Sequence, residues 1–175
     1  MAVICYGTDM VERSVTEMLE QGLGFLGELK PDDYTTVNEP HFTASIGGHY
    51  RHILEHVEVL LNGLDDGCVN YDSRGRDLTV EQCLETAKAK TTDLLARWNA
   101  ISSDRMAESV DVISKVSYNE TDSPAVKSSI GREAMFTSIH GVHHFALIKV
   151  MCQLRGLEME GAFGVAPATV AHQEK

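Results

Sequence analysis

The sequence predicts an all-α fold, a four-helix bundle in which one long crossover joins the third and fourth helices. Three observations predict it: apolar residues recur at helical spacing in four segments, capping residues or breakers bound those segments, and a long connection separates the last two. The predicted helices span about residues 9–30, 43–63, 79–101 and 129–155. With 43% apolar residues and no linker-like break, the chain is expected to form a single domain over residues 1–175.

Signals at both ends define the first two predicted helices. Asp9 and Glu12 match a capping box, and Pro31 stops the run of apolar residues that follows. The second helix begins between residues 40 and 45, and Gly63 is expected to end it. Its inward positions are apolar residues or histidines at alternating spacings of four and three: Phe42, Ile46, His49, Ile53, His56 and Leu60. This alternation is typical of a bundle seam.

The third and fourth predicted helices follow the same logic. Thr79 and Gln82 match a second capping box, Ser128 or Ser129 can cap the fourth helix, and Gly156 closes it. In the connection between them, apolar residues alternate with polar neighbours: Val110, Val112, Val116 and Tyr118. This pattern predicts a short strand inside a crossover that makes helix pairing non-sequential.

Charge and composition exclude several classes of partner. The formal net charge of −11 opposes binding to nucleic acid, because that affinity comes mainly from Lys and Arg that neutralise phosphates. Charges interrupt every apolar stretch before membrane-spanning length, and residues 1–5 do not begin a secretory signal. We therefore expect a cytoplasmic protein that binds neither nucleic acid nor membrane. Four widely spaced cysteines without a C-x-x-C pair predict reduced thiols: Cys5, Cys68, Cys83 and Cys152.

Six of the eight histidines occupy the second and fourth predicted helices: His49, His52, His56, His140, His143 and His144. Helical residues three or four apart are neighbours, with Cβ atoms roughly 5–6 Å apart, so two rings can reach one ion. Neutral imidazole is the commonest metal-donor side chain near pH 7, and three protein ligands with an open position are typical of a catalytic metal. The sequence therefore predicts a metal site between these two helices.

Spacing limits which histidines on the second helix share an ion. His49 and His56 are seven residues apart, which is about 10.5 Å along a helix, so they cannot both bind the same ion. His49 is the favoured ligand because it lies near the helix start, while His56 approaches the other end. The polar segment of residues 71–74 is expected to satisfy His56.

Two alternatives stay open at this point. On the fourth helix, spacing alone does not decide whether His143 or His144 joins His140, because adjacent residues differ by about 100° around the axis. A histidine on an apolar helix face is also more often a hydrogen-bonded core residue than a ligand. Several imidazoles buried together each need a donor and an acceptor, however, and a metal ion meets that need.

The chain resembles the DinB/YfiT-like family of metal-binding four-helix proteins. The matching segments are Ser45-Ile46-Gly47-Gly48-His49, Tyr71-Asp72-Ser73-Arg74-Gly75-Arg76-Asp77, Gly131-Arg132-Glu133-Ala134-Met135-Phe136, His140-Gly141-Val142-His143-His144 and Phe163-Gly164-Val165-Ala166-Pro167. The resemblance implies an up-down-down-up bundle, often a homodimer. It also implies a divalent ion, variously nickel, zinc, iron or manganese, held by His49, His140 and His144, with His143 beside the site.

The resemblance fixes the site better than the reaction. Some relatives activate a low-molecular-weight thiol, as bacillithiol- and mycothiol-dependent transferases and maleylpyruvate isomerase do. The similar domain of iron-dependent sulfoxide synthases carries H-x-x-x-H-x-E, whereas this chain has Ala146 at the acidic position, which weakens an oxidative function. We expect a metal-dependent enzyme that activates a small thiol cosubstrate or water for transfer to, or hydrolysis of, a small-molecule substrate.

Side chains near the predicted ligands have expected roles as well. His52 or His143 could relay protons, and Arg76 and Arg132 could hold an anionic substrate group, although ion pairs with neighbouring carboxylates are the simpler expectation for both arginines. The alternative from a different class is a non-catalytic stress-response protein that binds a metal or small ligand without turnover.

Overall fold

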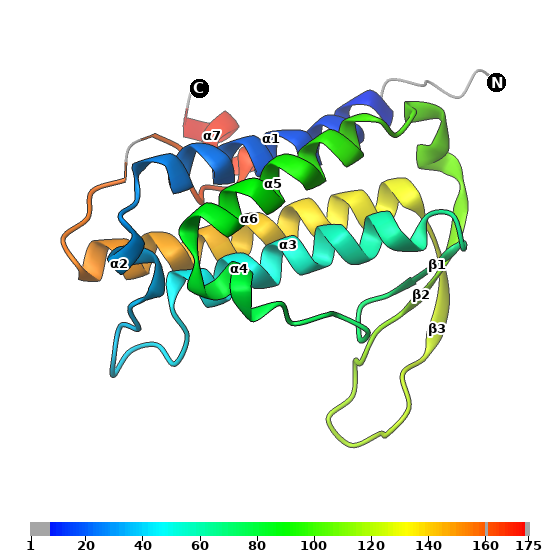
Figure 1. Ribbon diagram of the computed structural model, residues 1–175. Coiled ribbons are helices and arrows are strands. Elements are labelled where there is room, and N and C mark those ends of the chain that lie inside the picture. Colours follow the sequence, from blue (N-terminus) through cyan, green and yellow to red (C-terminus); the bar gives the residue numbers. More distant parts are fainter. Residues whose placement is uncertain (1–7, 160, 174–175) are drawn as a thin grey trace.

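Four long helices lie alongside one another in the computed structural model, which describes residues 8–159 and 161–173 (Figure 1). They are α1 (Thr8–Glu28), α3 (Ile46–Gly63), α5 (Leu84–Asn99) and α6 (Ile130–Leu154). α1 packs against α5 and α6, and α3 packs against the same two helices, so helices adjacent in sequence are not the ones that pair. α1 and α6 run in one direction, and α3 and α5 run in the other (Figure 1).

Shorter helices occupy the connections: α2 (Pro31–Thr35), α4 (Leu78–Gln82) and a 3-10 helix, η2 (Ser103–Ala107). A further short helix, α7 (Pro167–Gln173), follows α6. No helix of the described residues has the length and apolar character needed to cross a bilayer. The sequence features expected at residues 1–5, including a reduced Cys5, lie outside the residues that the structure describes.

A three-stranded sheet shows that the prediction of an all-α four-helix bundle is wrong. The strands are β1 (Cys68–Asn70), β2 (Ser109–Ile113) and β3 (Ala125–Ser129). β2 lies in the middle, parallel to β1 and antiparallel to β3, so the sheet is mixed. The long helices are therefore combined with a sheet at one end of the molecule, where α3 ends and α6 begins (Figure 1).

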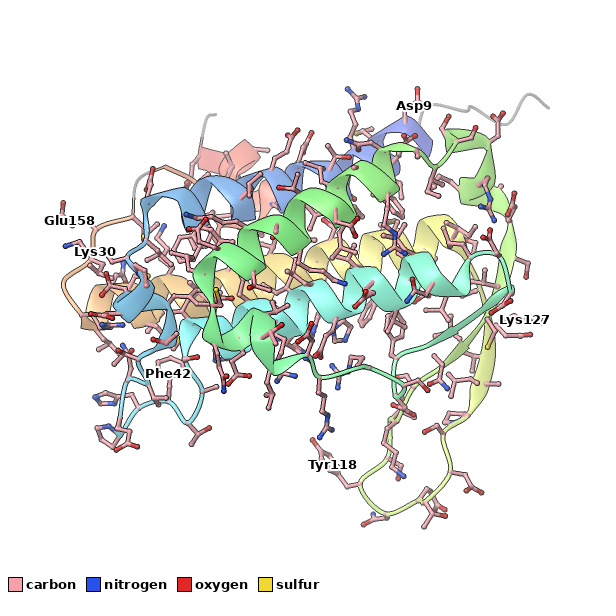
Figure 2. The ribbon with its side chains drawn as sticks, viewed as in Figure 1. Asp9, Lys30, Phe42, Tyr118, Lys127 and Glu158 are labelled. Carbon is pink, nitrogen blue, oxygen red and sulfur yellow. The ribbon has the colours of Figure 1, made fainter. Side chains whose placement is uncertain are left out.

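The predicted strand in the crossover corresponds only in part to β2. Val110 and Val112 are buried on the inner face of β2, as their alternation predicts. Val116 and Tyr118 lie beyond the end of the strand, in the exposed loop that leads to β3. Figure 2 shows Tyr118 on this loop, away from the helices.

Serine caps fix the starts of the two helices that carry the histidines. Ser45 Oγ accepts a hydrogen bond from the Gly48 amide at 3.1 Å, and Ser129 Oγ accepts one from the Arg132 amide at 3.2 Å. Both serines fall within the predicted starts of the second and fourth helices. Such caps pair amide groups that the first helical turn leaves without a partner.

The helix predicted at about residues 79–101 is divided. Cys83 has φ −137° and ψ 113°, an extended conformation that separates α4 from α5. Asp77, rather than Thr79, is the N-cap of α4, and its carboxylate accepts a hydrogen bond from the Thr79 amide at 2.9 Å. α4 consequently turns back onto the start of α3, where Gly47 lets the backbone of α4 approach closely.

Two different faces of α6 make contact with two different helices. Gly141 faces Met18 of α1, and a Cβ atom added at Gly141 would lie 2.7 Å from the Met18 sulfur. His140 and His144 point the other way and meet histidines of α3. Trp98 of α5 is fully buried in the core and donates a hydrogen bond to a backbone carbonyl of α1 at 2.9 Å. The histidine face of α6 is thus held in place by close packing on its opposite side.

Candidate metal centre

The interface between α3 and α6 is lined by five histidines. Three belong to α3 and two to α6: His49, His52, His56, His140 and His144. Spacings of three and four residues place the three rings of α3 on one face of that helix, and spacing of four does the same on α6. Phe42, in the loop before α3 (Figure 2), closes one end of the row with its ring 6.1 Å from that of His49.

Ring nitrogens from the two helices meet at short distances. His52 Nε2 lies 3.0 Å from His140 Nε2, and His49 Nδ1 lies 3.0 Å from His144 Nδ1. One nitrogen from each of His52, His140 and His144 can be chosen so that all three lie within 4.8 Å of one another. Nitrogens bound tetrahedrally to zinc at about 2.0–2.1 Å are separated by roughly 3.3–3.4 Å, so this donor set fits a metal ion with small ring movements.

The structure brings most of the predicted site residues together, but the three closest histidines are not the three predicted ligands. His140 and His144 both belong to the close group, which agrees with the i and i+4 pair. His49 contacts His144 but lies outside the group of three, whereas His52, expected as a proton relay, is within it. His143 is exposed, with its ring 5.6 Å from that of His144. The ligand set of His49, His140 and His144 stays a prediction.

His56 extends the row beyond the close group. Its Nδ1 donates a hydrogen bond to the backbone carbonyl of His52 at 2.8 Å, and its ring lies 4.3 Å from that of His140. Tyr71 stacks on His56 with ring centres 5.4 Å apart, so the segment expected to satisfy His56 does contact it, through a ring rather than a polar group. The Tyr71 hydroxyl in turn donates to Glu133 at 3.0 Å.

Burial keeps these imidazoles neutral. Loss of hydration, followed by neighbouring rings, lowers the pKa of His52 to about 2 and that of His144 to about 3. Burial likewise lowers the pKa of His56 to about 4 and lowers those of His49 and His140. Neutral rings are the form that binds metal, so the cluster presents its lone pairs near pH 7 without first losing protons.

Arg74 contacts His52, not the neighbouring His56 that its segment was expected to satisfy. Its Nη1 donates to His52 Nδ1 at 2.7 Å, from the loop between β1 and α4. Because arginine stays protonated, His52 Nδ1 must be an acceptor, and neutral His52 then carries its proton on Nε2 and donates to His140. His52 can bind an ion through Nε2 only when Arg74 releases Nδ1. The sequence signal for this contact was the polar segment of residues 71–74.

An open pocket of about 560 Å³ gives access to the cluster from the outer side of α6. Its lining residues are Arg132, Met135, Phe136, Ile139, His140 and His143. Phe136 stacks on His140 with ring centres 5.6 Å apart, and the Arg132 guanidinium lies 5.9 Å from the Phe136 ring centre. A small molecule with an apolar part can therefore reach His140 through this pocket.

The two arginines first considered for anion binding differ in their surroundings. Arg132 has a loose contact of 4.0 Å with Glu133, whose carboxylate already accepts hydrogen bonds from Tyr71 and Ser128. Arg76 is exposed and makes no ion pair within the part of the chain that the structure describes. The expected ion pair of Arg76 with its neighbour does not form, because that aspartate caps α4.

Comparison with known proteins gives one partial likeness. No family model matches the chain, and no solved structure matches it. Over 107 residues the chain is 30% identical to FK506-binding protein 5 of Rhizopus delemar, a match that covers 61% of this chain and 28% of that protein. The chain thus corresponds to less than a third of this relative, and the match does not assign it to a family. The resemblance to DinB/YfiT-like proteins remains a prediction.

Proposed function

We propose that the chain is a metal-dependent enzyme that activates a small thiol or water for transfer to, or hydrolysis of, a small-molecule substrate. The observation that carries this proposal is the group of three histidine nitrogens, drawn from two helices, that lie within 4.8 Å of one another. The imidazole donors suit nickel, zinc, iron or manganese. A bound ion of this kind would lower the pKa of a coordinated thiol or water and polarise an electrophile.

We propose separate residues for binding the metal ion and for admitting the substrate. His140 and His144 are common to the close group and to the predicted ligand set, and either His52 or His49 completes the set. The pocket beside His140 leads from solvent to the cluster and offers apolar walls to a substrate. We propose His143, exposed at the rim, as a proton relay, and His52, hydrogen-bonded to His140, in the same role if His49 is the third ligand.

An external thiol fits the histidine cluster better than the buried Cys152 does. No described cysteine belongs to the group of potential ligands. Cys152 is buried, and burial raises its pKa to about 11, so it is a thiol at neutral pH and a poor nucleophile. A thiol cosubstrate that enters through the pocket would avoid this limitation.

Elemental analysis of protein purified without a polyhistidine tag tests the metal site. We expect about one equivalent of a divalent first-row ion in the wild type and its loss in His140→Ala. His41→Ala is the matched control, because His41 is an exposed histidine in the loop before α3 and should not change the metal content. His49→Ala and His52→Ala then show which residue of α3 is the third ligand. Wild-type protein without metal would overturn the proposal.

Activity is tested separately on metal-loaded protein. A small thiol with a reactive electrophile tests transfer, and a series of simple esters tests hydrolysis. Turnover that disappears in His140→Ala would support the enzyme, whereas rates equal to those of this variant would reject it. Unchanged substrates together with one equivalent of bound metal would instead favour the non-catalytic metal-binding protein.

We also propose that the protein forms a homodimer and is located in the cytoplasm. Exposed apolar side chains near the end of α6, outside the pocket beside His140, support a homodimer: Val150 and Leu154. Light scattering of the wild type and Val150→Lys checks it, since a dimer through this surface should dissociate in the variant. A cytoplasmic location is supported by the free thiols of Cys68, Cys83 and Cys152, and cell fractionation tests it.

A further inference from the structure

The guanidinium of Arg74 lies beside the histidine cluster without an acidic partner among the described residues. It is half-buried, and its one hydrogen bond goes to His52 Nδ1 at 2.7 Å. Five of the eight arginines have a carboxylate within 4.0 Å: Arg51, Arg97, Arg105, Arg132 and Arg155. Of the other three, Arg13 and Arg76 are exposed to solvent, whereas Arg74 is half-buried and faces imidazoles rather than a carboxylate.

The carboxylates near Arg74 are occupied elsewhere. Asp72, two residues away, accepts hydrogen bonds from the Lys115 amide and the Ser123 hydroxyl. Glu133 accepts from Tyr71 and from Ser128. The histidine rings, kept neutral by burial, supply no negative charge. Arg74 therefore has no direct carboxylate contact among the described residues, although it lies close enough to Asp72 to help lower the pKa of that carboxyl.

We propose that Arg74 binds the carboxylate of a small organic substrate beside the histidine cluster. This inference names the substrate class of the proposed function and rests on it. The planar fork of a guanidinium matches a carboxylate, with two parallel hydrogen bonds. A single arginine in an acidic chain suits a singly charged anion better than a phosphate, which usually requires several donors.

The hydrogen bonds of Arg74 leave room for such an anion. A guanidinium has five N–H donors, and the contact with His52 uses one of them. A carboxylate can therefore take two of the other donors, and a charged acceptor is a stronger partner for the guanidinium than the neutral His52 nitrogen is.

Titration of the metal-free protein with propionate and propionamide tests the proposal, because the two probes have the same shape and differ in charge. The imidazole proton signals of His52 report binding by NMR, at constant ionic strength and with chelator present. We expect propionate to bind roughly tenfold more tightly than propionamide. Equal affinities would overturn the proposal, and so would inorganic phosphate binding more tightly than propionate.

Variants of the same loop identify the residue responsible. Arg74→Gln should remove the preference for propionate, and Arg74→Lys should retain only part of it, because an ammonium keeps the charge without the planar fork. Arg76→Gln, an exposed arginine two residues away, should behave as the wild type. A preference unchanged in Arg74→Gln would contradict the assignment. Should Arg74→Gln fail to fold, Arg74→Met keeps the apolar stem and allows the same comparison.

The outcome separates this inference from the proposed function. A preference for propionate that depends on Arg74, in a wild type that holds no metal in elemental analysis, supports the carboxylate site and rejects the metal enzyme. One equivalent of metal without any such preference rejects the carboxylate site alone.

Discussion

His52 and His140 meet nitrogen to nitrogen at 3.0 Å, although 88 residues separate them in the sequence. The contact joins α3 to α6, and its geometry requires one ring to donate and the other to accept. Arg74 decides the direction, because its permanent charge makes His52 the donor toward His140. A loop residue therefore controls which lone pairs the cluster presents.

The stability of the metal-free protein should fall as the pH is lowered from 7 to 5. Burial holds the pKa of His56 at about 4, below its ordinary value of 6.5, so below pH 6.5 the unfolded chain binds the proton more readily. The contribution is complete above pH 6.5 and is lost as the pH falls toward the folded value. We expect His56 alone to account for about 1–2 kcal/mol of unfolding free energy over this range.

Urea denaturation at several pH values measures this effect. His56→Gln keeps a side-chain donor for the His52 carbonyl and should show a shallower decline of the unfolding free energy with falling pH. A decline as steep as that of the wild type would mean that His56 protonates equally in the folded and unfolded states.

Arg74→Gln should raise the affinity for a divalent cation. The substitution removes a positive charge next to the rings and frees His52 Nδ1 to carry the proton, so that Nε2 can bind the ion. We expect a gain of roughly threefold or more in competition with a chelating dye. Adding His52→Ala to this variant should abolish the gain, since His52 provides the new ligand. A variant that binds the ion more weakly than the wild type would show that Arg74 supports the site rather than limiting it.

Gly141→Ala should destabilise the fold even though alanine favours helices. The added Cβ would lie 2.7 Å from the Met18 sulfur and crowd a side chain that is only 3% exposed. Overpacking of this kind costs about 1–3 kcal/mol, more than the roughly 1 kcal/mol that alanine gains over glycine in a helix. In a Met18→Ala background the same change should become stabilising. Thermal unfolding of the wild type, the two single variants and the double variant measures both effects. The same sign in both backgrounds would exclude the contact as the cause.

Tyr71→Phe should cost about 1–2 kcal/mol of unfolding free energy, because it removes one hydrogen-bond partner of the buried Glu133 carboxylate. The ring stack on His56 would remain. Tyr118→Phe is the matched control, since Tyr118 is fully exposed and its hydroxyl has no such partner among the described residues. Equal stability of the two variants in chemical denaturation would contradict the role given to the Tyr71 hydroxyl.

Local signals in the sequence were enough to place the helices that carry the site. Ser45 caps α3 at the end of the range predicted for its start, and Ser129 is one of the two caps predicted for α6, because a cap depends only on residues a few positions away. Cys83 shows the limit of this approach. The apolar spacing on either side of it suggested one helix, and its extended backbone follows from the packing of α4 on α3.

The sheet was missed for a physical reason. β1 has three residues, of which only Val69 is buried, too short for an alternating pattern. β3 is largely exposed and contains two serines, which also give no strand signal. Both strands exist because β2 pairs with them, and pairing between distant segments cannot be read from local spacing.

The sequence predicted a site between two helices but not the contacts within it. Helical spacing left open whether His143 or His144 joins His140, and the resemblance to DinB/YfiT-like proteins implied His144. The close approach of His52, rather than His49, to His140 depends on how α3 is rotated against α6. The contact of Arg74 depends on the path of a loop after β1, which no local pattern describes.

Ser129 is at once the last residue of β3 and the residue that starts α6, and it pairs with Ser109 of β2. Strand pairing therefore anchors α6 along its axis, so the sheet sets how far this helix slides past α3. Insertions into the exposed turn of residues 114–124 should leave the anchor intact, whereas a slip of one residue between β2 and β3 would turn the histidines away from their partners. Natural length variation in this molecule is accordingly expected at the tip of that turn, and a two-residue insertion there that kept the NMR signals of His140 unchanged would demonstrate it.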